Sequence, residues 1–256
     1  LNKSKFIEIL SSLEIKAKDT LLVNSNILNL LIKNRNCINA EEIIDSLIEA
    51  VTNKGTLMFP AYNWNFCKGE EFNLKKTKSS TGALSNLSLL RKDFKRSVNP
   101  IYSFSIFGKN NDYISNLNHE SCFSLNSPFG YLIDNKGKNL FIDLDYKLAL
   151  TLVHVAEEFI GVNYRYFKSF SGDFINLENK KKKVTFKMYV RCLDKVKSTI
   201  IDDKFDKVLE NNKAIKKTNF EGINFCCVDL SKAFKLMCKE LKTKNSLIYP
   251  DLIKQT

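Results

Sequence analysis

The stretch Ala149-Leu-Thr-Leu-Val-His-Val-Ala-Glu-Glu158 is a nearly continuous apolar run that four polar residues interrupt. Apolar side chains fill almost every position from Leu148 to Ile160, which predicts a helix buried on most of its sides. At about 100° per residue the exceptions fall within roughly a third of the helix circumference. They are Thr151, His154, Glu157 and Glu158. The run therefore predicts a buried helix with one narrow polar stripe, which holds one of the 2 histidines of the chain.

Burying such a stripe is costly unless its groups hydrogen-bond to one another or face a cleft. One interpretation makes His154 a core histidine that is hydrogen-bonded to Glu157 or Glu158. The other makes it a general base oriented by a carboxylate, because a neutral imidazole titrates near neutral pH and needs a partner that fixes its tautomer. The helix alone does not decide between these two interpretations.

The bulk composition is that of a globular protein. A chain of 256 residues can bury a substantial core, and 44% hydrophobic with 27% charged residues is ordinary. The N-terminal residues lead into an amphipathic pattern, and no apolar run approaches the ~20 residues that a membrane span needs. The 7 cysteines lie mostly in strand-like or helix-like runs, without a C-x-x-C motif. We therefore expect a cytoplasmic protein with reduced cysteines, no metal site and no membrane span.

The chain is strongly basic, with 40 Lys and Arg against 28 Asp and Glu, a formal net charge of +12. Such a balance suits nucleic acid, membrane lipid or a small anionic ligand. Asn and Lys are abundant throughout, which indicates a compositional bias. The densest run, Lys180 to Lys183, has the pattern of a solvated turn between two strands.

Helix and strand patterns alternate along the chain and predict an α/β protein. We expect helices at 3–13 with Ser4 as cap, 27–32, 39–51 with Asn39 as cap, 81–91, from 127, 148–160, 203–211 and 230–241. We expect strands at 20–23, 56–59, 102–107, 139–143, 166–174, 184–190 and 224–228. The result is a single domain over 1–256, an αβα layered sandwich with a mixed central sheet. Its core spans about 15–175, and a β-rich C-terminal extension spans about 176–256.

Two segments between these elements have the composition of binding sites. Asn24-Ser-Asn26 separates a strand from a helix, and such a turn presents free backbone N–H groups to a phosphate or a pantetheine arm. Residues 60–80 form a long loop that holds Tyr62, Trp64 and Asn65. Loops of this length inside a compact domain are commonly functional.

Five short motifs occur in series along the chain. They are Gly-Thr-Leu-Met-Phe-Pro-Ala-Tyr-Asn-Trp-Asn-Phe-Cys (55–67), Ser-Thr-Gly-Ala-Leu (80–84), Asn-Pro-Ile-Tyr-Ser-Phe (99–104), Ser-Pro-Phe-Gly (127–130) and Thr-Leu-Val-His-Val-Ala-Glu-Glu (151–158). In this order they resemble the aminoglycoside 3-N-acetyltransferase family, whose members move an acetyl group from acetyl-CoA to an amine. The resemblance covers about residues 20–175 and implies an αβα domain with acetyl-CoA as co-substrate.

The family's T-x-x-H-x-x-E motif falls on Thr151, His154 and Glu157. The resemblance therefore implies that His154 is the general base and that Glu157 orients it. The H-S-S-L element appears as Asn24-Ser-Asn-Ile27, where only one serine is kept, and S-x-H-P appears as Ser97-Val-Asn-Pro100. Lys78 replaces the proline of T-P-S. These departures indicate a divergent member, and we expect the divergence in the choice of substrate.

A two-sided site follows from these matches. We place on the coenzyme side Asn24, Ser25, Asn26, Ser80, Thr81, Gly82, Ser103 and Phe104. We place on the acceptor side Tyr62, Trp64, Asn65, Thr151 and Glu158. Oxyanion donors are expected either at the helix start after residue 80 or in the turn at 24–26. A general base contributes typically ~10²–10⁴-fold, and direct transfer in a ternary complex is favoured over a cysteine acyl-enzyme.

The net charge guides the choice of acceptor. Aminoglycosides are polycations that an acidic cleft would collect, whereas a nucleotide-linked amino sugar offers a diphosphate to Lys and Arg. We therefore expect a nucleotide-linked amino sugar for surface glycan synthesis, with antibiotic aminoglycosides as the alternative. A basic nucleic-acid-binding protein is a remote alternative, which leaves the polar stripe unexplained. The expected partner is a small-molecule amine and no nucleic acid, and the chain is expected to be a monomer or homodimer.

Overall fold

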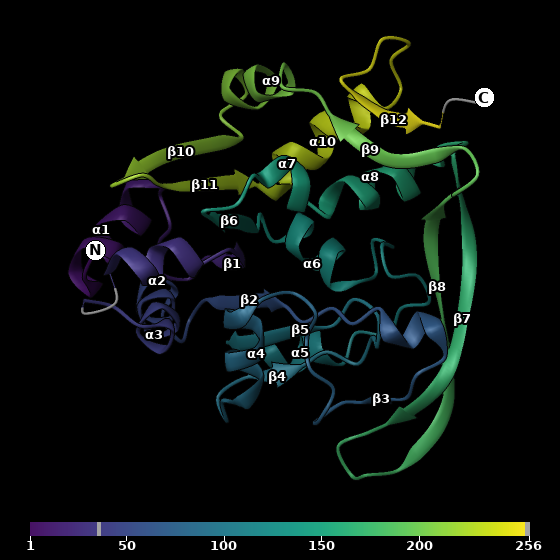
Figure 1. The fold of residues 1–256 in the computed structure, drawn as a ribbon, viewed down its shortest axis with the longest axis horizontal. Coiled ribbons are helices and arrows are strands. Elements are labelled where there is room, and N and C mark those ends of the chain that lie inside the picture. The colour runs from purple at the N-terminus through teal and green to yellow at the C-terminus, as the bar shows by residue number, and fades with distance from the viewer. Residues whose placement is uncertain (35–36, 254–256) are drawn as a thin grey trace.

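The computed structural model describes residues 1–34 and 37–253, and within them seven strands form the central sheet (Figure 1). Strands β6, β1 and β2 run parallel, and the neighbours on both sides are antiparallel. The mixed central sheet that the sequence predicts is confirmed. The strand order is β10 (Ile215–Phe220), β11 (Ile223–Asp229), β6 (Lys138–Ile142), β1 (Thr20–Ser25), β2 (Thr56–Pro60), β5 (Phe104–Gly108) and β4 (Lys95–Arg96).

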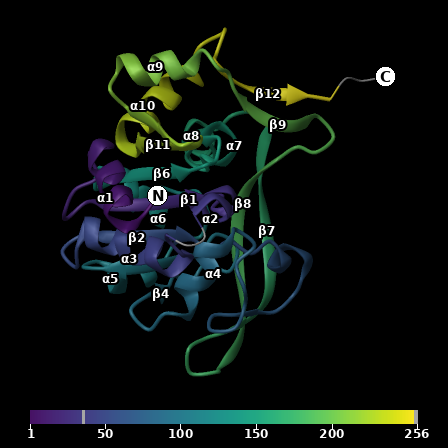
Figure 2. The same cartoon turned by 60° about the vertical axis from the view of Figure 1, so that its left-hand side comes forward.

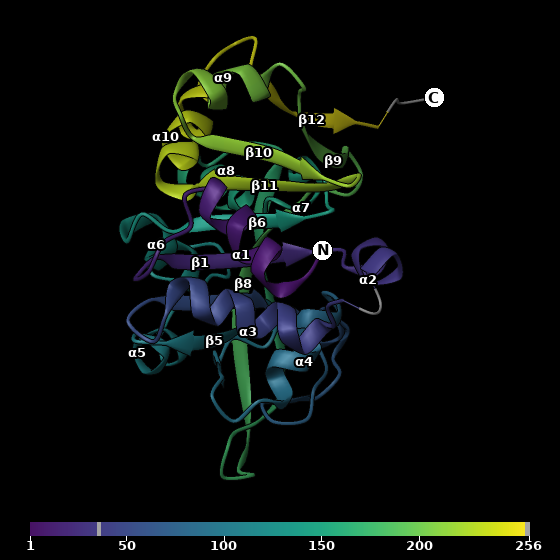
Figure 3. The same cartoon turned by 90° about the vertical axis from the view of Figure 1, so that its left-hand side faces the viewer.

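Helices cover both faces of this sheet because successive strand residues point to opposite sides. Leu21 and Val23 belong to one apolar cluster, whereas Leu22 belongs to the other. The first face carries α1 (Lys3–Ser12), α2 (Leu28–Asn34), α3 (Ala40–Val51) and α4 (Ala83–Leu90), of which α1 and α3 lie in front of the sheet in Figure 3. The second carries α5 (Asn111–Ser115), α6 (Pro128–Asp134), α7 (Tyr146–Ala149), α8 (Leu152–Ile160), α9 (Phe205–Asn211) and α10 (Leu230–Glu240). The αβα layering is therefore confirmed.

A long hairpin stands beside the sandwich and extends past its body (Figure 2). Its strands β7 (Arg165–Ile175) and β8 (Lys181–Arg191) pair along their whole length, and β3 (Phe72–Asn73) joins β7. Lys181 to Lys183 lie in β8, so the lysine run is part of a strand and not the predicted turn. A second small sheet pairs β9 (Val196–Ile201) with β12 (Ile248–Leu252), and η1 (Asn65–Lys68) is a short 3-10 helix.

Local signals explain where several helices begin. Asn39 caps α3, as predicted, and the Glu42 side chain completes a capping box with it. Asn2 caps α1 by accepting a hydrogen bond from the Lys5 backbone, so the predicted cap at Ser4 is wrong. Among the described residues no helix has the length and apolarity that a membrane crossing requires.

The predicted helix at 148–160 is interrupted before its polar stripe. The chain leaves α7 at Leu150, whose ψ is 81°, and α8 begins at Leu152. Leu150 and Leu152 are both 2% exposed, so the break lets both side chains enter the core. Thr151 is the N-cap residue of α8, and its side chain makes no capping hydrogen bond. His154, Glu157 and Glu158 therefore lie on α8, a short helix that is separate from α7.

Candidate active site

The structure brings His154 and Glu157 together on α8. Their spacing of three residues places both side chains on one face, and His154 Nδ1 lies 2.7 Å from Glu157 Oε2. Glu157 is completely buried, whereas the His154 side chain is 28% exposed. The pair therefore has a buried carboxylate behind the imidazole and an open side in front of it.

Three further side chains hold the Glu157 carboxylate. The hydroxyls of Tyr164 and Thr199 donate to Oε1 at 2.8 and 2.6 Å. Arg165 Nε lies 2.7 Å from Oε2 as an ion pair whose geometry is too bent for a hydrogen bond. Burial alone would raise the pKa of Glu157, but His154, Arg165 and Thr199 together hold that pKa below its usual range. The carboxylate is therefore ionised and cannot rotate freely.

The contacts of His154 Nδ1 select its tautomer. Glu157 Oε2 lies at 2.7 Å and Arg165 Nη2 at 3.0 Å from this one nitrogen. If Nδ1 carried no proton, it and Glu157 Oε2 would be two hydrogen-bond acceptors only 2.7 Å apart. Arg165 Nη2 does not need Nδ1 as an acceptor, because it also donates to the Thr199 hydroxyl at 3.0 Å. The proton therefore lies on Nδ1 and is donated to Glu157, which leaves the Nε2 lone pair free.

The pKa of His154 is lowered from its ordinary value. Burial is the largest cause, the carboxylate of Glu157 opposes it, and the positive charges of Arg165 and Arg191 lower the pKa further. The imidazole is consequently neutral at neutral pH, which is the form that can accept a proton.

His154 opens into a pocket of about 270 Å³ beside the β7–β8 hairpin. Aromatic side chains from three parts of the chain make its walls, and three cations from the hairpin line it. The lining residues are Tyr102, Phe123, His154, Arg165, Tyr166, Lys168, Phe170, Met188, Tyr189, Val190, Arg191 and Leu193. Phe123 lies against the imidazole with ring centres 5.4 Å apart. The arrangement places a proton acceptor in a small, mostly aromatic cavity.

Part of the predicted coenzyme side forms a continuous surface. Gly82 is the N-cap of α4 with a φ of +94° and no side-chain cap, so the first backbone N–H groups of that helix are open. A Cβ on Gly82 would lie 3.6 Å from the carbonyl oxygen of Ser25, which places the two predicted turns side by side. Ser80 and Asn26 are exposed at the same turns, and the Thr81 hydroxyl donates to the Pro60 carbonyl. This surface has the N–H donors that suit a phosphate.

Three other predicted coenzyme residues are buried and bonded within the protein. Asn24 donates to Asn139 at 2.8 Å inside the sheet, and the Ser103 hydroxyl donates to the Ala61 carbonyl at 2.6 Å. Phe104 is fully buried, with its ring centre 5.1 Å from that of Phe129. Their side chains support the wall of the site from inside and present no surface to a ligand.

The predicted acceptor residues surround a line of aromatic rings. Tyr62 is 4% exposed, and its hydroxyl makes no hydrogen bond to any described residue although Thr151 lies beside it. Its ring centre is 4.5 Å from that of Tyr102, which lines the His154 pocket. Trp64 and Asn65 are exposed at the outer end. These rings connect the turn at Ser80, whose N–H donates to the Tyr62 carbonyl, with the imidazole.

Glu158 is half-buried and turned away from the imidazole network. The Ser121 hydroxyl donates to its Oε2 at 2.5 Å. Burial raises the pKa of Glu158, and the bond from Ser121 opposes the rise. Glu158 is thus anchored to the loop that holds Phe123.

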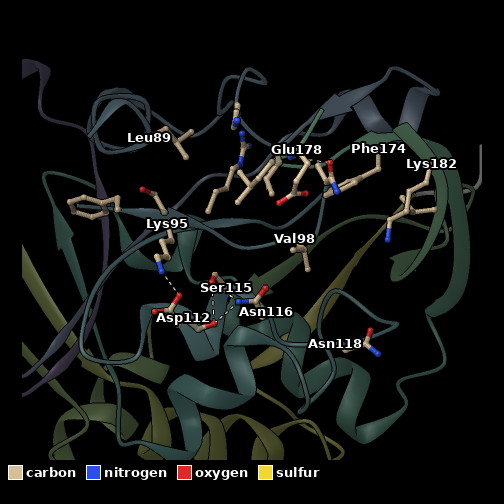
Figure 4. A pocket seen from close by; sticks show the side chains of 18 of the residues that line it. Leu89, Lys95, Val98, Asp112, Ser115, Asn116, Asn118, Phe174, Glu178 and Lys182 are labelled. Carbon is tan, nitrogen blue, oxygen red and sulfur yellow. Dashed lines mark hydrogen bonds and ion pairs between the residues drawn. The ribbon is translucent and has the colours of Figure 1, made fainter. Parts of the chain in front are cut away.

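A larger hollow of about 630 Å³ lies elsewhere, between the β4 edge of the sheet and the hairpin (Figure 4). Lys95 and Asp112 pair on one side of it, while Phe174 and Glu178 come from the hairpin on the other. None of the predicted catalytic or binding residues lines it. Size alone therefore does not locate the site.

Sequence patterns alone did not indicate the residues that surround the histidine pair. Tyr164 and Arg165 follow Glu157 by seven and eight positions, where the helical pattern ends and a strand pattern begins. That junction was the available signal. Thr199 lies 42 positions after Glu157 on β9, a strand that the sequence patterns did not predict, and nothing local marks it.

A sequence profile of the aminoglycoside 3-N-acetyltransferase family matches residues 31–242. The chain belongs to this family. No curated protein shows a significant sequence match. Among solved structures it is similar to AAC-IIIb in a binary complex with CoASH, at 15% identity over 94% of this chain and 96% of that one, with a TM-score of 0.79. The YokD protein from Bacillus subtilis is 21% identical over 93% of this chain and 92% of that one, with a TM-score of 0.74. AAC-VIa bound to sisomicin is 14% identical over 94% of this chain and 97% of that one, with a TM-score of 0.75. These neighbours confirm the fold.

As a member of the aminoglycoside 3-N-acetyltransferase family, the protein is an acetyl-CoA-dependent N-acetyltransferase. The residues present fit this co-substrate. The open start of α4 beside Ser25 offers N–H donors for phosphate. The predicted family, fold class, acyltransferase activity and co-substrate are confirmed.

Proposed function

We propose that His154 is the general base that activates the amine of an amino sugar for acetylation. The observation that supports this most directly is the asymmetry of the imidazole. Nδ1 donates to the fully buried Glu157, while the other side of the ring faces a cavity. A structural histidine would be enclosed on both sides, whereas a base needs one nitrogen held and one free.

Acetyl-CoA supplies the acetyl group as a thioester. The acceptor amine must lose a proton to attack it, and His154 Nε2 takes that proton as the new C–N bond forms. The C–S bond breaks, and coenzyme A leaves as the thiolate, which the imidazolium can then protonate. Glu157 stays bonded to Nδ1 and stabilises the imidazolium that results.

We propose two sides for the site. The N–H groups at Gly82 and the adjoining turn at Ser25 hold the coenzyme's phosphates. Asn24, Ser103 and Phe104 act from inside the wall, because their side chains are buried. The acceptor then occupies the pocket in front of His154.

A cysteine acyl-enzyme is disfavoured by the state of the nearby thiols. Burial raises the pKa of Cys67 to about 11. Cys122 is fully buried next to Asn99, and its pKa is raised further by the same cause. Neither thiol is ionised at neutral pH, and the thiolate is the nucleophilic form. Direct transfer in a ternary complex is therefore the simpler chemistry.

For the acceptor, the comparisons favour an aminoglycoside over the nucleotide-linked amino sugar that the net charge suggested. The matched family is named for aminoglycoside acetylation, and one structural neighbour is bound to sisomicin. No comparison supports a sugar nucleotide. An aminoglycoside is therefore the first acceptor to test.

The test is release of coenzyme A thiol from acetyl-CoA in the presence of sisomicin and a panel of smaller amino sugars. His154→Ala should lower kcat by about 10²–10⁴-fold on any active acceptor. His119→Asn is the matched control, because an amide keeps the bond from His119 Nδ1 to the Ser121 carbonyl. Turnover on no acceptor would contradict the proposed activity, and a near-normal kcat in His154→Ala would contradict the base.

A further inference from the structure

The pocket in front of His154 carries positive charge that no carboxylate cancels. Arg165, Lys168 and Arg191 line it, and no Asp or Glu does. Arg165 is paired with Glu157, whereas Lys168 and Arg191 form no ion pair with any described residue. Lys168 instead lies 5.3 Å from the centre of the Phe170 ring, another wall residue. Two cations are thus available to a ligand.

The charge acts where the acceptor must lie. Arg191 is close enough to lower the pKa of His154 from across the pocket. The Glu158 carboxylate, on the same helix as His154, is half-buried and bonded to Ser121. A cationic ligand therefore finds no free anionic partner in the pocket, and several ammonium groups would each be repelled.

The size of the pocket adds a second restriction. At about 270 Å³ it is at or below the lower end of small-molecule sites, which span about 300–1,000 Å³. Its walls are aromatic faces such as Tyr102 and Tyr189, against which one sugar ring packs. The pocket therefore holds about one sugar ring beside the imidazole.

A phosphate monoester matches both observations. It carries a charge of about −1.5 to −2 at neutral pH, close to the two uncancelled cations, and Arg and Lys are its usual protein partners. We propose that the acceptor is a small amino sugar that bears a phosphate, which Lys168 and Arg191 hold while the amine faces His154. This proposal rests on the proposed acetylation of an amino sugar at His154, and it departs from the aminoglycoside acceptor that the comparisons favour. The pocket then orients the acceptor by its anionic end.

The experiment compares glucosamine 6-phosphate with glucosamine, which differ only in the phosphate, and with the polycation sisomicin. A charge-assisted contact predicts a kcat/KM about tenfold to a hundredfold higher for the phosphate. Lys168→Gln and Arg191→Gln together should abolish that preference through KM. Lys183→Gln is the matched control, since it is exposed on the same strand as Arg191 and outside the pocket. Equal kcat/KM for the two sugars, or a preference for sisomicin, would overturn the proposal.

A binding measurement separates this inference from the proposed function. Calorimetry compares the two acetylated products, N-acetylglucosamine 6-phosphate and N-acetylglucosamine, on the wild type and the double variant. Selective binding of the phosphate that the double variant loses supports the anion site even if no acceptor is acetylated, in which case the proposed function alone fails. Acetyl transfer without any effect of the phosphate or of the double variant would refute the anion site alone.

Discussion

Glu157→Gln removes one charge at the centre of the site and keeps the shape of the side chain. The glutamine oxygen can still accept from His154 Nδ1, and its amide nitrogen can donate to the Tyr164 and Thr199 hydroxyls, which rotate to accept. What changes is the charge behind the imidazole and the charge beside Arg165, whose Nε lies 2.7 Å from the carboxylate. The substitution therefore tests whether the carboxylate does more than fix the ring.

The expected loss follows from the geometry. At an effective dielectric of about 20, two unit charges about 4 Å apart interact by about 4 kcal/mol, which is roughly a thousandfold in rate if lost entirely. The retained hydrogen bond reduces that figure, so we expect kcat to fall by about 10²–10³-fold. Arg165 becomes a buried charge without its partner, and breaking such a pair costs about 3–5 kcal/mol. For a chain of this length that lowers the Tm by roughly 6–20 °C.

The assay is kcat and kcat/KM against pH, with thermal unfolding on the same samples. Glu157 raises the pKa of His154, so the Glu157→Gln substitution should lower that pKa. The acid limb of the kcat/KM–pH profile, where His154 becomes protonated, should then move to lower pH while kcat falls. The double variant Glu157→Gln with Arg165→Met removes both buried charges and should recover much of the Tm but not kcat. If Glu157→Gln keeps kcat within about twofold and leaves the acid limb in place, the carboxylate does not stabilise the imidazolium.

Three shorter tests address other contacts. Arg165→Gln removes a charge that lowers the pKa of His154, so the acid limb of kcat/KM, which lies below the ordinary histidine value of about 6.5, should move to higher pH; an unchanged limb would show that this charge is not felt. Gly82→Ala adds a side chain at a φ of +94° where α4 begins, and should raise the KM for acetyl-CoA severalfold while the KM for the amine is kept; equal effects on both would contradict the coenzyme assignment. Gly130→Ala would bring a Cβ within 1.8 Å of the Leu125 carbonyl and should lower expression of folded protein, whereas Gly69→Ala, with nothing within 4 Å, should cost only about 1 kcal/mol in a denaturant titration.

The fold was predictable wherever one residue pattern decided an element. The apolar face of α3 and its cap at Asn39 could be read directly, and so could the buried strand that holds Leu21 and Leu22. Strand β10, Ile215-Lys-Lys-Thr-Asn-Phe220, could not be read, because it is an edge strand whose exposed lysines hide its pattern. An edge strand is stabilised by backbone hydrogen bonds to its neighbour, here β11, and no side-chain pattern in the sequence indicates those bonds.

The site likewise has a part that the sequence indicated and a part that only the tertiary structure brings together. His154 and Glu157 are three residues apart on one helix, so local periodicity placed them on one stripe, and the resemblance to the family motif selected Glu157 over Glu158. Thr199 and Arg191 reach the pair from β9 and β8, and only the tertiary structure decides which of many Lys, Arg and Thr side chains do so. The polar stripe was visible in the sequence, but the charge of the pocket in front of it was not.

The charge around His154 has two opposed effects on an attacking amine. Arg165 and Arg191 lower the pKa of His154, which keeps the imidazole unprotonated but makes it a weaker base. The same positive field disfavours an ammonium in the pocket, so it also lowers the pKa of the acceptor and eases the proton transfer that a weaker base must perform. Such a field would repel the acceptor unless the molecule carried its own negative group. A phosphate held at Lys168 and Arg191 would meet that requirement at a distance from the amine, so the field could act on the reacting nitrogen alone.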